Sequence, residues 1–269
     1  MDCSSPIGIF DSGIGGLTVV KAVQNALPNE DIIYFGDTAR VPYGIKSEHT
    51  IRSYALQITE FLMDRDVKMI LIACNTVSAS ARDGIQKATG DIPVLDVITA
   101  GSKAAMQFPH HKHIGVIGTL ATIGSKAYEE AIRQYNGEVE ITAEACPMLV
   151  PLAEEGWTDN EIAEQIVKKY LQKFEGSDID SLILGCTHYP LFTNTIRKVL
   201  HDPDIEIVDS ALSIASMAKK KLGDLQLLND EQSGNFNCYV SDRPQRFREL
   251  AERFLGQDIP NVHIAQLQQ

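Results

Sequence analysis

The sequence predicts an α/β protein built from two related, doubly wound domains with mainly parallel sheets and an active site in the cleft between them. Short β-type runs alternate with amphipathic helices along the 269 residues, which is the pattern of parallel βαβ units. Several of these runs are continuously apolar, as expected for strands that helices cover on both faces. Three sequence blocks also recur at a nearly constant spacing, which indicates two similar halves.

Nine segments have the composition of β-strands. Each is short and rich in isoleucine, valine, leucine or aromatic residues, and helical periodicity or turn residues separate it from the next. In chain order the expected strands are residues 7–10, 31–35, 68–73, 92–95, 113–118, 138–142, 181–185, 205–208 and 236–240.

Two of the intervening helices have clear boundary signals. Residues Thr158 to Glu161 form the pattern of a capping box, and an apolar stripe from Ile162 to Phe174 follows it. We expect Trp157, just before this box, to pack against the core. A second helix is expected to begin near Pro244 and to end at Gly256, because proline favours the first helical turn and glycine the position after the last.

The internal repeat sets the expected domain boundaries. The block IGIFDSGIGG resembles IGVIGTLATIG, MILIACNT resembles SLILGCTH, and the segment around Asp96 resembles the segment around Asp209. We place the crossovers between halves near 96–101 and 208–211. The first domain is then discontinuous, residues 1–97 plus 209–269, and the second domain is residues 98–208.

The net charge of −12 bears on the partners of the protein. Nucleic acids and anionic membranes both require a basic face, so we expect neither as a partner. A small anionic substrate remains compatible, because helix N-termini can bind it through backbone N–H groups. The sequence begins without a signal peptide and has no apolar run of membrane-spanning length, so we expect a cytoplasmic protein with free cysteines.

Two cysteines occupy matching positions. Cys74 and Cys186 each follow a buried-type strand, and ligands of open α/β sheets bind at the carboxyl ends of strands. A single cysteine there is more often a small buried apolar residue, but two at equivalent places suggest that both thiols face one cleft. A thiolate on one face of a carbon and a thiol on the other can invert that carbon by proton transfer.

Neighbouring residues fit this chemistry. Asn75, Thr76 and Thr187 offer donors beside the thiols, and His188 is close enough to Cys186 in sequence to influence its protonation. Asp11 lies at a strand end, where it could receive an ammonium group or act as an accessory base. Its loop lacks the G-x-G-x-x-G and Walker spacings, which argues against nucleotide binding. The loop 40–44 could cap a carboxylate with backbone N–H groups.

No metal site is expected. The histidines His110, His111 and His113 superficially resemble a metal-binding tract, but no cysteine or carboxylate partner lies nearby in the sequence. We therefore interpret them as surface residues.

The motifs GIFDSGIGGLTVV, YFGDTARVPYG, LIACNTVSA, IGVIGT and LGCTHYPL resemble those of bacterial glutamate racemases, in order from residue 7 to beyond residue 190. The resemblance implies two related α/β domains with the active site between them. It also implies cofactor-independent interconversion of L- and D-glutamate, supplying D-glutamate for peptidoglycan, and a homodimer.

The resemblance also implies roles for individual residues. Cys74 would act on D-glutamate and Cys186 on L-glutamate, and Asp11, Glu154 and His188 would be accessory groups. Glu155 is adjacent to Glu154, so either could be the accessory carboxylate. The implied substrate contacts are Asp11, Ser12, Tyr43, Gly44, Asn75, Thr76, Thr119, Thr187 and His188.

Three alternatives remain open at this point. The same fold could racemise aspartate or another amino acid. Cys186 with His188 could instead form the nucleophilic pair of an amidase or hydrolase, which would leave Cys74 dispensable. A two-lobed small-molecule binding protein also fits the architecture but leaves the paired thiols unexplained.

Overall fold

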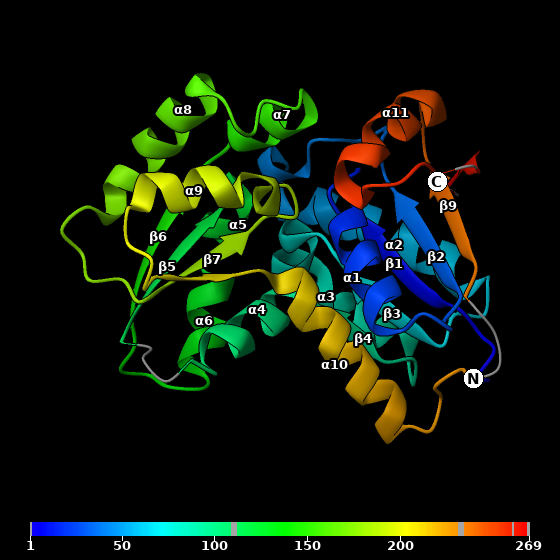
Figure 1. Cartoon of the computed structure of the whole chain (residues 1–269). Coiled ribbons are helices and arrows are strands. Elements are labelled where there is room, and N and C mark those ends of the chain that lie inside the picture. Colours follow the sequence, from blue (N-terminus) through cyan, green and yellow to red (C-terminus); the bar gives the residue numbers. More distant parts are fainter. Residues whose placement is uncertain (1, 109–111, 231–233, 260, 268–269) are drawn as a thin grey trace.

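The computed structural model describes residues 2–108, 112–230, 234–259 and 261–267, and it consists of two α/β halves side by side (Figure 1). One half holds a six-stranded sheet and the other a four-stranded sheet. Within the described residues, every strand pair is parallel. The predicted fold class is therefore confirmed.

The larger sheet joins the beginning and the end of the chain. Its strand order is β10-β9-β2-β1-β3-β4, so the C-terminal strands β9 and β10 extend the sheet beyond β2. In Figure 1 the C-terminal strands are orange to red and β2 is blue. Its strands are β1 (Ile7–Asp11), β2 (Ile32–Gly36), β3 (Met69–Ile72), β4 (Val94–Asp96), β9 (Phe236–Val240) and β10 (Val262–Ile264).

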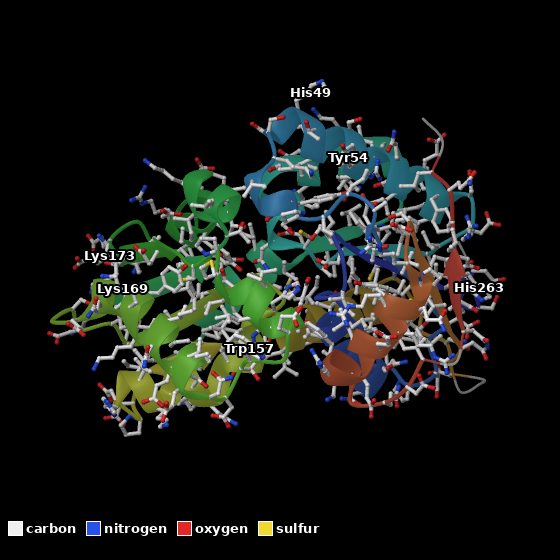
Figure 2. The ribbon with its side chains drawn as sticks, turned by 90° about the horizontal axis from the view of Figure 1, so that it is seen from above. His49, Tyr54, Trp157, Lys169, Lys173 and His263 are labelled. Carbon is white, nitrogen blue, oxygen red and sulfur yellow. The ribbon has the colours of Figure 1, made fainter. Side chains whose placement is uncertain are left out.

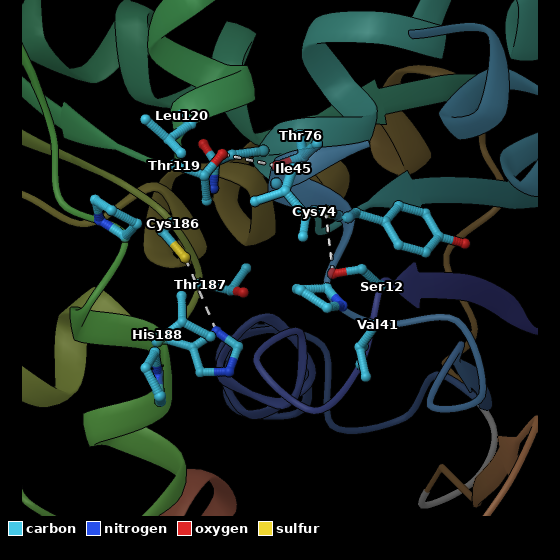
Figure 3. A pocket seen from close by; sticks show the side chains of 18 of the residues that line it. Ser12, Val41, Ile45, Cys74, Thr76, Thr119, Leu120, Cys186, Thr187 and His188 are labelled. Atoms are coloured by element: carbon cyan, nitrogen blue, oxygen red, sulfur yellow. Dashed lines mark hydrogen bonds between the residues drawn. The ribbon is translucent and has the colours of Figure 1, made fainter. Parts of the chain in front are cut away.

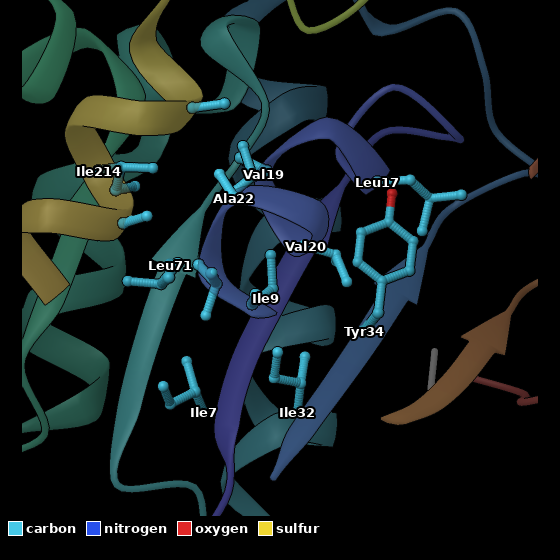
Figure 4. Packing of buried hydrophobic residues seen from close by; sticks show 14 of the residues in the cluster. Ile7, Ile9, Leu17, Val19, Val20, Ala22, Ile32, Tyr34, Leu71 and Ile214 are labelled. Atoms are coloured by element: carbon cyan, nitrogen blue, oxygen red, sulfur yellow. The ribbon is translucent and has the colours of Figure 1, made fainter. Parts of the chain in front are cut away.

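Helices cover both faces of this sheet because side chains alternate along each strand. Ile7 and Ile9 of β1 pack with α1 and α10 on one face (Figure 4), in a cluster that α11 completes, whereas Phe10 packs with α2 and α3 on the other. The helices are α1 (Leu17–Ala26), α2 (Glu48–Met63), α3 (Asn75–Thr89), α10 (Ser210–Asp224) and α11 (Pro244–Leu255), with the 3-10 turn η1 (Tyr43–Ile45) between β2 and α2.

The smaller sheet has the order β6-β5-β7-β8 and is likewise covered on both faces. Its strands are β5 (His113–Gly118), β6 (Glu140–Ala145), β7 (Ser181–Gly185) and β8 (Glu206–Val208). Its helical elements are α4 (Val97–Ala105), α5 (Leu120–Gly124), α6 (Ala127–Arg133), α7 (Leu149–Glu154), α8 (Glu161–Leu171), η2 (Gln172–Phe174), η3 (Tyr189–Phe192) and α9 (Thr193–Leu200).

The two sheets share a local arrangement that positions the site. In the larger sheet β1 lies between β2 and β3, and in the smaller sheet β5 lies between β6 and β7. Cys74 follows β3 and Cys186 follows β7, so each cysteine comes after the strand beside the central strand of its half. The similarity between the two halves expected from the repeat therefore extends to the placement of both thiols.

Each of the nine expected strands overlaps a strand of the structure. One further strand, β10, was not predicted from the sequence. β10 spans three residues that are partly or fully exposed, so it has neither the length nor the apolar pattern of a buried strand. The helix expected at Pro244 has the predicted ends: Gly256 follows it with a left-handed φ of 78°.

The expectations about the segment before α8 were wrong. The side chain of Asn160, not of Thr158, caps α8 by accepting a hydrogen bond from the Ala163 amide. The Thr158 carbonyl instead accepts a hydrogen bond from Thr195 Oγ1 at 2.6 Å, which holds this residue in the preceding loop. Ile162 is exposed, because the buried face of α8 follows Ala163, Val167 and Leu171. The Trp157 side chain also lies at the surface (Figure 2) and is not a packing anchor.

The interpretation of the histidine tract was wrong for His113. This residue begins the central strand β5 and is buried, with Nε2 2.8 Å from Thr142 Oγ1. His110 and His111 lie outside the described residues. In the part of the chain that the structure describes, no helix is long and apolar enough to cross a membrane.

Candidate active site

A cavity of about 370 Å³ lies between the two halves, and loops from the carboxyl ends of strands in both halves line it (Figure 3). All of the site residues expected from the sequence line it except Asp11, which is buried beside it. The lining residues are Ser12, Gly13, Val41, Pro42, Tyr43, Gly44, Ile45, Cys74, Asn75, Thr76, Thr119, Leu120, Pro147, Val150, Pro151, Glu154, Cys186, Thr187 and His188.

Cys74 forms one side of the cavity. It is the N-cap residue of α3, in an extended conformation that lets the chain turn from the buried strand into the helix. Its thiol is buried, with Sγ 3.5 Å from Ser12 Oγ. Burial raises the pKa of the Cys74 thiol to about 12, and the negative charge of Asp11 adds to this, while hydrogen bonds from Ser12 and the Val77 amide act in the opposite direction. Cys74 is therefore a thiol at neutral pH in the ligand-free site.

Cys186 forms the opposite side (Figure 3) and has different neighbours. Its Sγ lies 3.9 Å from Nδ1 of His188, and Nε2 of the same ring lies 3.3 Å from Glu154 Oε1. A carboxylate, an imidazole and a thiol thus form a chain that ends at the cavity. Glu155 does not take part, since its carboxylate lies 3.7 Å from Arg246.

The charge of His188 follows from these contacts. Burial lowers the pKa of the imidazole, but the hydrogen bonds and negative charges of Cys186 and Glu154 outweigh burial and raise this pKa to about 10. These contacts favour the imidazolium form of His188 beside the Cys186 sulfur. The two thiols face groups of opposite sign: a cation beside Cys186 and the Asp11 carboxyl near Cys74.

Asp11 lies beneath the loop that follows β1. Its Oδ2 accepts a hydrogen bond from the Gly13 amide at 3.0 Å, while Oδ1 is buried and has no hydrogen-bond partner among the residues that the structure describes. Burial raises the pKa of this carboxyl, and the charge of His188 and the backbone N–H groups of the loop partly offset that rise.

Two glycines of this loop are required by close contacts, Gly15 with the other half and Gly16 within its own half. A Cβ at Gly15 would lie 2.2 Å from Thr187 Oγ1 and 2.6 Å from His188 Nδ1. A Cβ at Gly16 would lie 2.5 Å from the Asp11 Cβ. The glycine-rich loop therefore brings Asp11 against the Cys186 loop of the other half, a role that requires no nucleotide.

Polar side chains from both halves also meet at the cavity. Thr76 Oγ1 of α3 lies 3.0 Å from Thr119 Oγ1, which follows β5 in the other half. The Tyr43 hydroxyl donates a hydrogen bond to the buried carboxylate of Asp37. The expected contact of Tyr43 with a substrate would therefore come from its ring or backbone.

The sequence interpretation missed the apolar part of the lining. Ile45 and Leu120 are exposed side chains, and Val150 belongs to the short helix α7. Exposed apolar residues in loops and one-turn helices have no periodicity, so no sequence pattern marks them. Across the described ranges, no group of three His, Cys, Asp or Glu side chains is arranged to hold a metal ion.

Two buried thiols from equivalent strand ends, facing one cavity, suit the inversion of a carbon centre. The chain belongs to the Asp/Glu/Hydantoin racemase family, whose pattern matches residues 15–218. It is 52% identical over 261 residues to the glutamate racemase of Chlorobaculum parvum, covering 97% of this chain and 96% of that protein.

Solved structures agree with this relationship. The glutamate racemase of Francisella tularensis, in complex with D-glutamate, superposes with a TM-score of 0.93 at 44% identity, and the match covers 98% of each chain. Glutamate racemase isoform RacE1 of Bacillus anthracis superposes with a TM-score of 0.94 at 37% identity, again over 98% of each chain.

Proposed function

We propose that this protein interconverts L- and D-glutamate by two-base proton transfer that needs no cofactor. The observation that carries the proposal is the pair of buried cysteines, Cys74 and Cys186, on opposite sides of one cavity between the halves. The extensive identity to proteins named glutamate racemase supports glutamate over aspartate as the substrate.

The chemical step removes a proton from one face of the α-carbon and adds a proton to the opposite face. The thiolate on one face takes the α-proton and becomes a thiol, and the electron pair of the broken C–H bond remains on the substrate as a carbanion delocalised into its carboxylate. The thiol on the other face then gives its proton to the α-carbon and becomes the thiolate. One turnover therefore leaves the opposite cysteine charged, and solvent exchange restores the starting state.

The surroundings of the thiols support different starting charges. Cys186 Sγ lies 3.9 Å from Nδ1 of His188, whose pKa is raised, and the Glu154 carboxylate contributes to that rise. Cys74 begins as the proton donor, since its pKa is raised. In this scheme Cys186 removes the proton of L-glutamate, and Cys74 removes the proton of D-glutamate in the reverse reaction.

In the same proposal the polar lining binds the substrate. Asp11 is buried beside the cavity and does not line it, so its charge would act on the ammonium group from behind the lining, and that cation would ease ionisation of Cys74. The two carboxylates bind hydrogen-bond donors at the ends of the strands. These donors are Ser12, Asn75, Thr76, Thr119, Thr187 and His188, with Tyr43 and Gly44 forming the adjoining wall.

The test is chiral chromatography of L-glutamate incubated with purified protein in deuterated water. Two opposed bases predict D-glutamate that carries deuterium at the α-carbon, while recovered L-glutamate stays protiated at low conversion. Label in the unreacted substrate would indicate a single base serving both faces. Racemisation of aspartate alone would assign the other substrate. Amide hydrolysis that requires Cys186 but not Cys74 would identify a hydrolase.

Further proposals concern the organisation and setting of the protein. The domain boundaries 1–97 plus 209–269 and 98–208 are supported by the strands, since the larger sheet draws on residues 7–96 and 236–264 and the smaller on 113–208. Free thiols at a reactive site suit a reducing cytoplasm. A homodimer and a supply of D-glutamate to peptidoglycan follow from the family resemblance.

A further inference from the structure

Asp37 is a buried carboxylate that contacts one wall of the cavity from behind. It follows β2, is fully buried and is not itself part of the cavity lining. Its Oδ2 accepts a hydrogen bond from the Tyr43 hydroxyl and lies 2.6 Å from Nε of Arg40, with which it forms an ion pair. Its Oδ1 accepts a 2.7 Å hydrogen bond from Ser241 Oγ. One carboxylate thus joins three side chains.

Two of these partners belong to the wall or adjoin it. Residues 41–45, which include η1, all line the cavity. Arg40 lies just before this segment and Tyr43 is in its middle, so the carboxylate holds the segment at two points. The wall also reaches the other half, since a Cβ at Gly44 would lie 2.9 Å from Cβ of Thr119. A shift of the segment would therefore change both the shape of the cavity and its contact with the second half.

Arg40 is fixed on its far side by α2. Its Nη1 donates a 2.5 Å hydrogen bond to Oε1 of Gln57, and its guanidinium carbon lies 3.9 Å from the ring centre of Tyr54. The Tyr54 ring also contacts the ring of Tyr43, with the two centroids 5.7 Å apart. The ion pair of Arg40 with Asp37 therefore forms a fixed base for the wall.

The C-terminal part of the chain holds the same base. Ser241, in the turn between β9 and α11, accepts a 2.8 Å hydrogen bond from the Ala39 amide while it donates to Asp37. Next to it, Thr38 Oγ1 donates to the Asp242 carbonyl at 2.5 Å and accepts from the Asp242 amide at 2.9 Å. Residues about two hundred positions away thus fix the start of the wall segment.

We propose that Asp37 is a positioning residue that sets the wall 41–45 and thereby the affinity of the site for a dicarboxylate. The proposal rests on the proposed function, in which this wall adjoins a substrate with two carboxylates. Charge alone predicts the opposite effect, because a buried carboxylate near the cavity repels an anionic ligand and its neutralisation would tighten binding. If the carboxylate instead fixes the wall, its neutralisation weakens binding although a negative charge is removed.

The test compares Asp37→Asn with Glu30→Gln. Asparagine keeps the shape of the side chain, but it carries no charge for Arg40 and offers one acceptor oxygen in place of two. Glu30 is the matched control: its buried carboxylate pairs with Lys68 and lies before β2, at the opposite end of the strand from Asp37. Both variants neutralise a buried acid that is paired with a cation, and only Asp37 has a partner in the wall.

Two readouts are needed, ligand affinity and the mobility of the wall. Calorimetry with glutarate, an inert dicarboxylate, should show about tenfold weaker binding to Asp37→Asn, the effect of one lost charged hydrogen bond. KM for glutamate should rise in proportion, while kcat changes by less than about threefold, because the hydrogen bonds of Asp37 lead to the wall rather than to the thiols.

Hydrogen exchange with mass spectrometry measures the mobility of residues 40–46. The Lys46 amide donates a 2.9 Å hydrogen bond to the Tyr43 carbonyl, and amides of this segment should exchange faster in Asp37→Asn. Glu30→Gln should lower the melting temperature and leave the affinity and the exchange of this segment as in the wild type.

Tighter or unchanged glutarate binding in Asp37→Asn would overturn the proposal, and so would unchanged exchange of residues 40–46. An equal loss of affinity in Glu30→Gln would also overturn it, and a loss confined to kcat would indicate a role in proton transfer instead. A wild type that neither binds glutarate nor racemises glutamate would refute the proposed function. The exchange measurement needs no ligand and would still decide whether Asp37 holds the wall.

A second variant covers the case in which Asp37→Asn does not fold. Ser241→Ala removes the hydrogen bond to Oδ1 of Asp37 from a position outside the cavity lining. It should weaken glutarate binding about threefold and speed the exchange of residues 40–46. Unchanged binding in this variant would overturn the proposal.

Discussion

The chain of Glu154, His188 and Cys186 predicts how one carboxylate controls the charge of the histidine. Glu154→Gln removes the negative charge 3.3 Å from His188 Nε2 but keeps an oxygen that can accept the same hydrogen bond. The variant therefore isolates the electrostatic part of the interaction. In the wild type the pKa of His188 is raised from 6.5 to about 10, largely by its hydrogen bonds to Cys186 and Glu154 acting against burial.

The magnitude follows from distance and exposure. A carboxylate at hydrogen-bond distance raises the pKa of a histidine by about 1–3 units. The Glu154 side chain is 38% exposed, so water screens it, and we expect the lower end, about one unit or about 1.4 kcal/mol. The pKa of His188 should thus fall from about 10 to about 9.

The sign of the stability effect is determined by the raised pKa. A histidine with a higher pKa in the folded state contributes stability that is fully present below pH 6.5 and is lost as the pH rises to about 10. In Glu154→Gln this stability should be lost completely at a pH about one unit lower than in the wild type. Stability of the variant that rises with pH across this range would contradict the assignment.

The assay is an NMR titration of histidine-labelled protein, together with the pH profile of kcat/KM. Glu155→Gln is the matched control, because Glu155 faces Arg246 and is not in contact with His188. We expect the His188 titration to move only in Glu154→Gln. A wild-type His188 that titrates near 6.5, or an equal shift in both variants, would refute the reasoning.

Three further predictions concern the thiols and the core. Cys74→Ser and Cys186→Ser should each lower racemisation by more than about 100-fold, measured by chiral chromatography, because each removes an acid–base group; a single variant of normal activity would contradict this. Iodoacetamide at neutral pH should modify Cys186 before Cys74, because a cation faces only the former; peptide mass spectrometry showing the reverse order would exclude it. Lys68→Met should cost about 3–5 kcal/mol by leaving the buried Glu30 carboxylate without its cation, and an unchanged melting temperature would disprove it.

The local sequence pattern was enough to predict where the two reactive cysteines lie. The apolar run of β3 and the residues after it locate Cys74 at a strand end, and the same holds for β7 and Cys186. Because parallel strands bring their carboxyl ends to one edge, the two positions could be predicted without knowing the order of the strands. Glu154 is different: it lies in a one-turn helix without a periodic signal, and only the family resemblance pointed to it.

Features that depend on tertiary contacts could not be predicted from the sequence. The pairing of β9 with β2 joins residues about two hundred positions apart, and nothing in either strand specifies its neighbour. The contact of Gly15 with Thr187 likewise arises only when the two halves meet. The donated hydrogen bond from Tyr128 to Asn75 also crosses between the halves, and α6 shows no sign of it in its own sequence.

These cross-half contacts have a consequence for catalysis. Neither half alone sets the separation of the two thiols, because each half supplies one of them. The halves are joined around the cavity by the hydroxyl pair of Thr76 and Thr119 and by Tyr128 on Asn75. At the rim, Arg253 of α11 donates a 2.5 Å hydrogen bond to the Glu154 carbonyl. Because proton transfer depends steeply on distance, these contacts limit how far the thiols can separate while a substrate α-carbon lies between them.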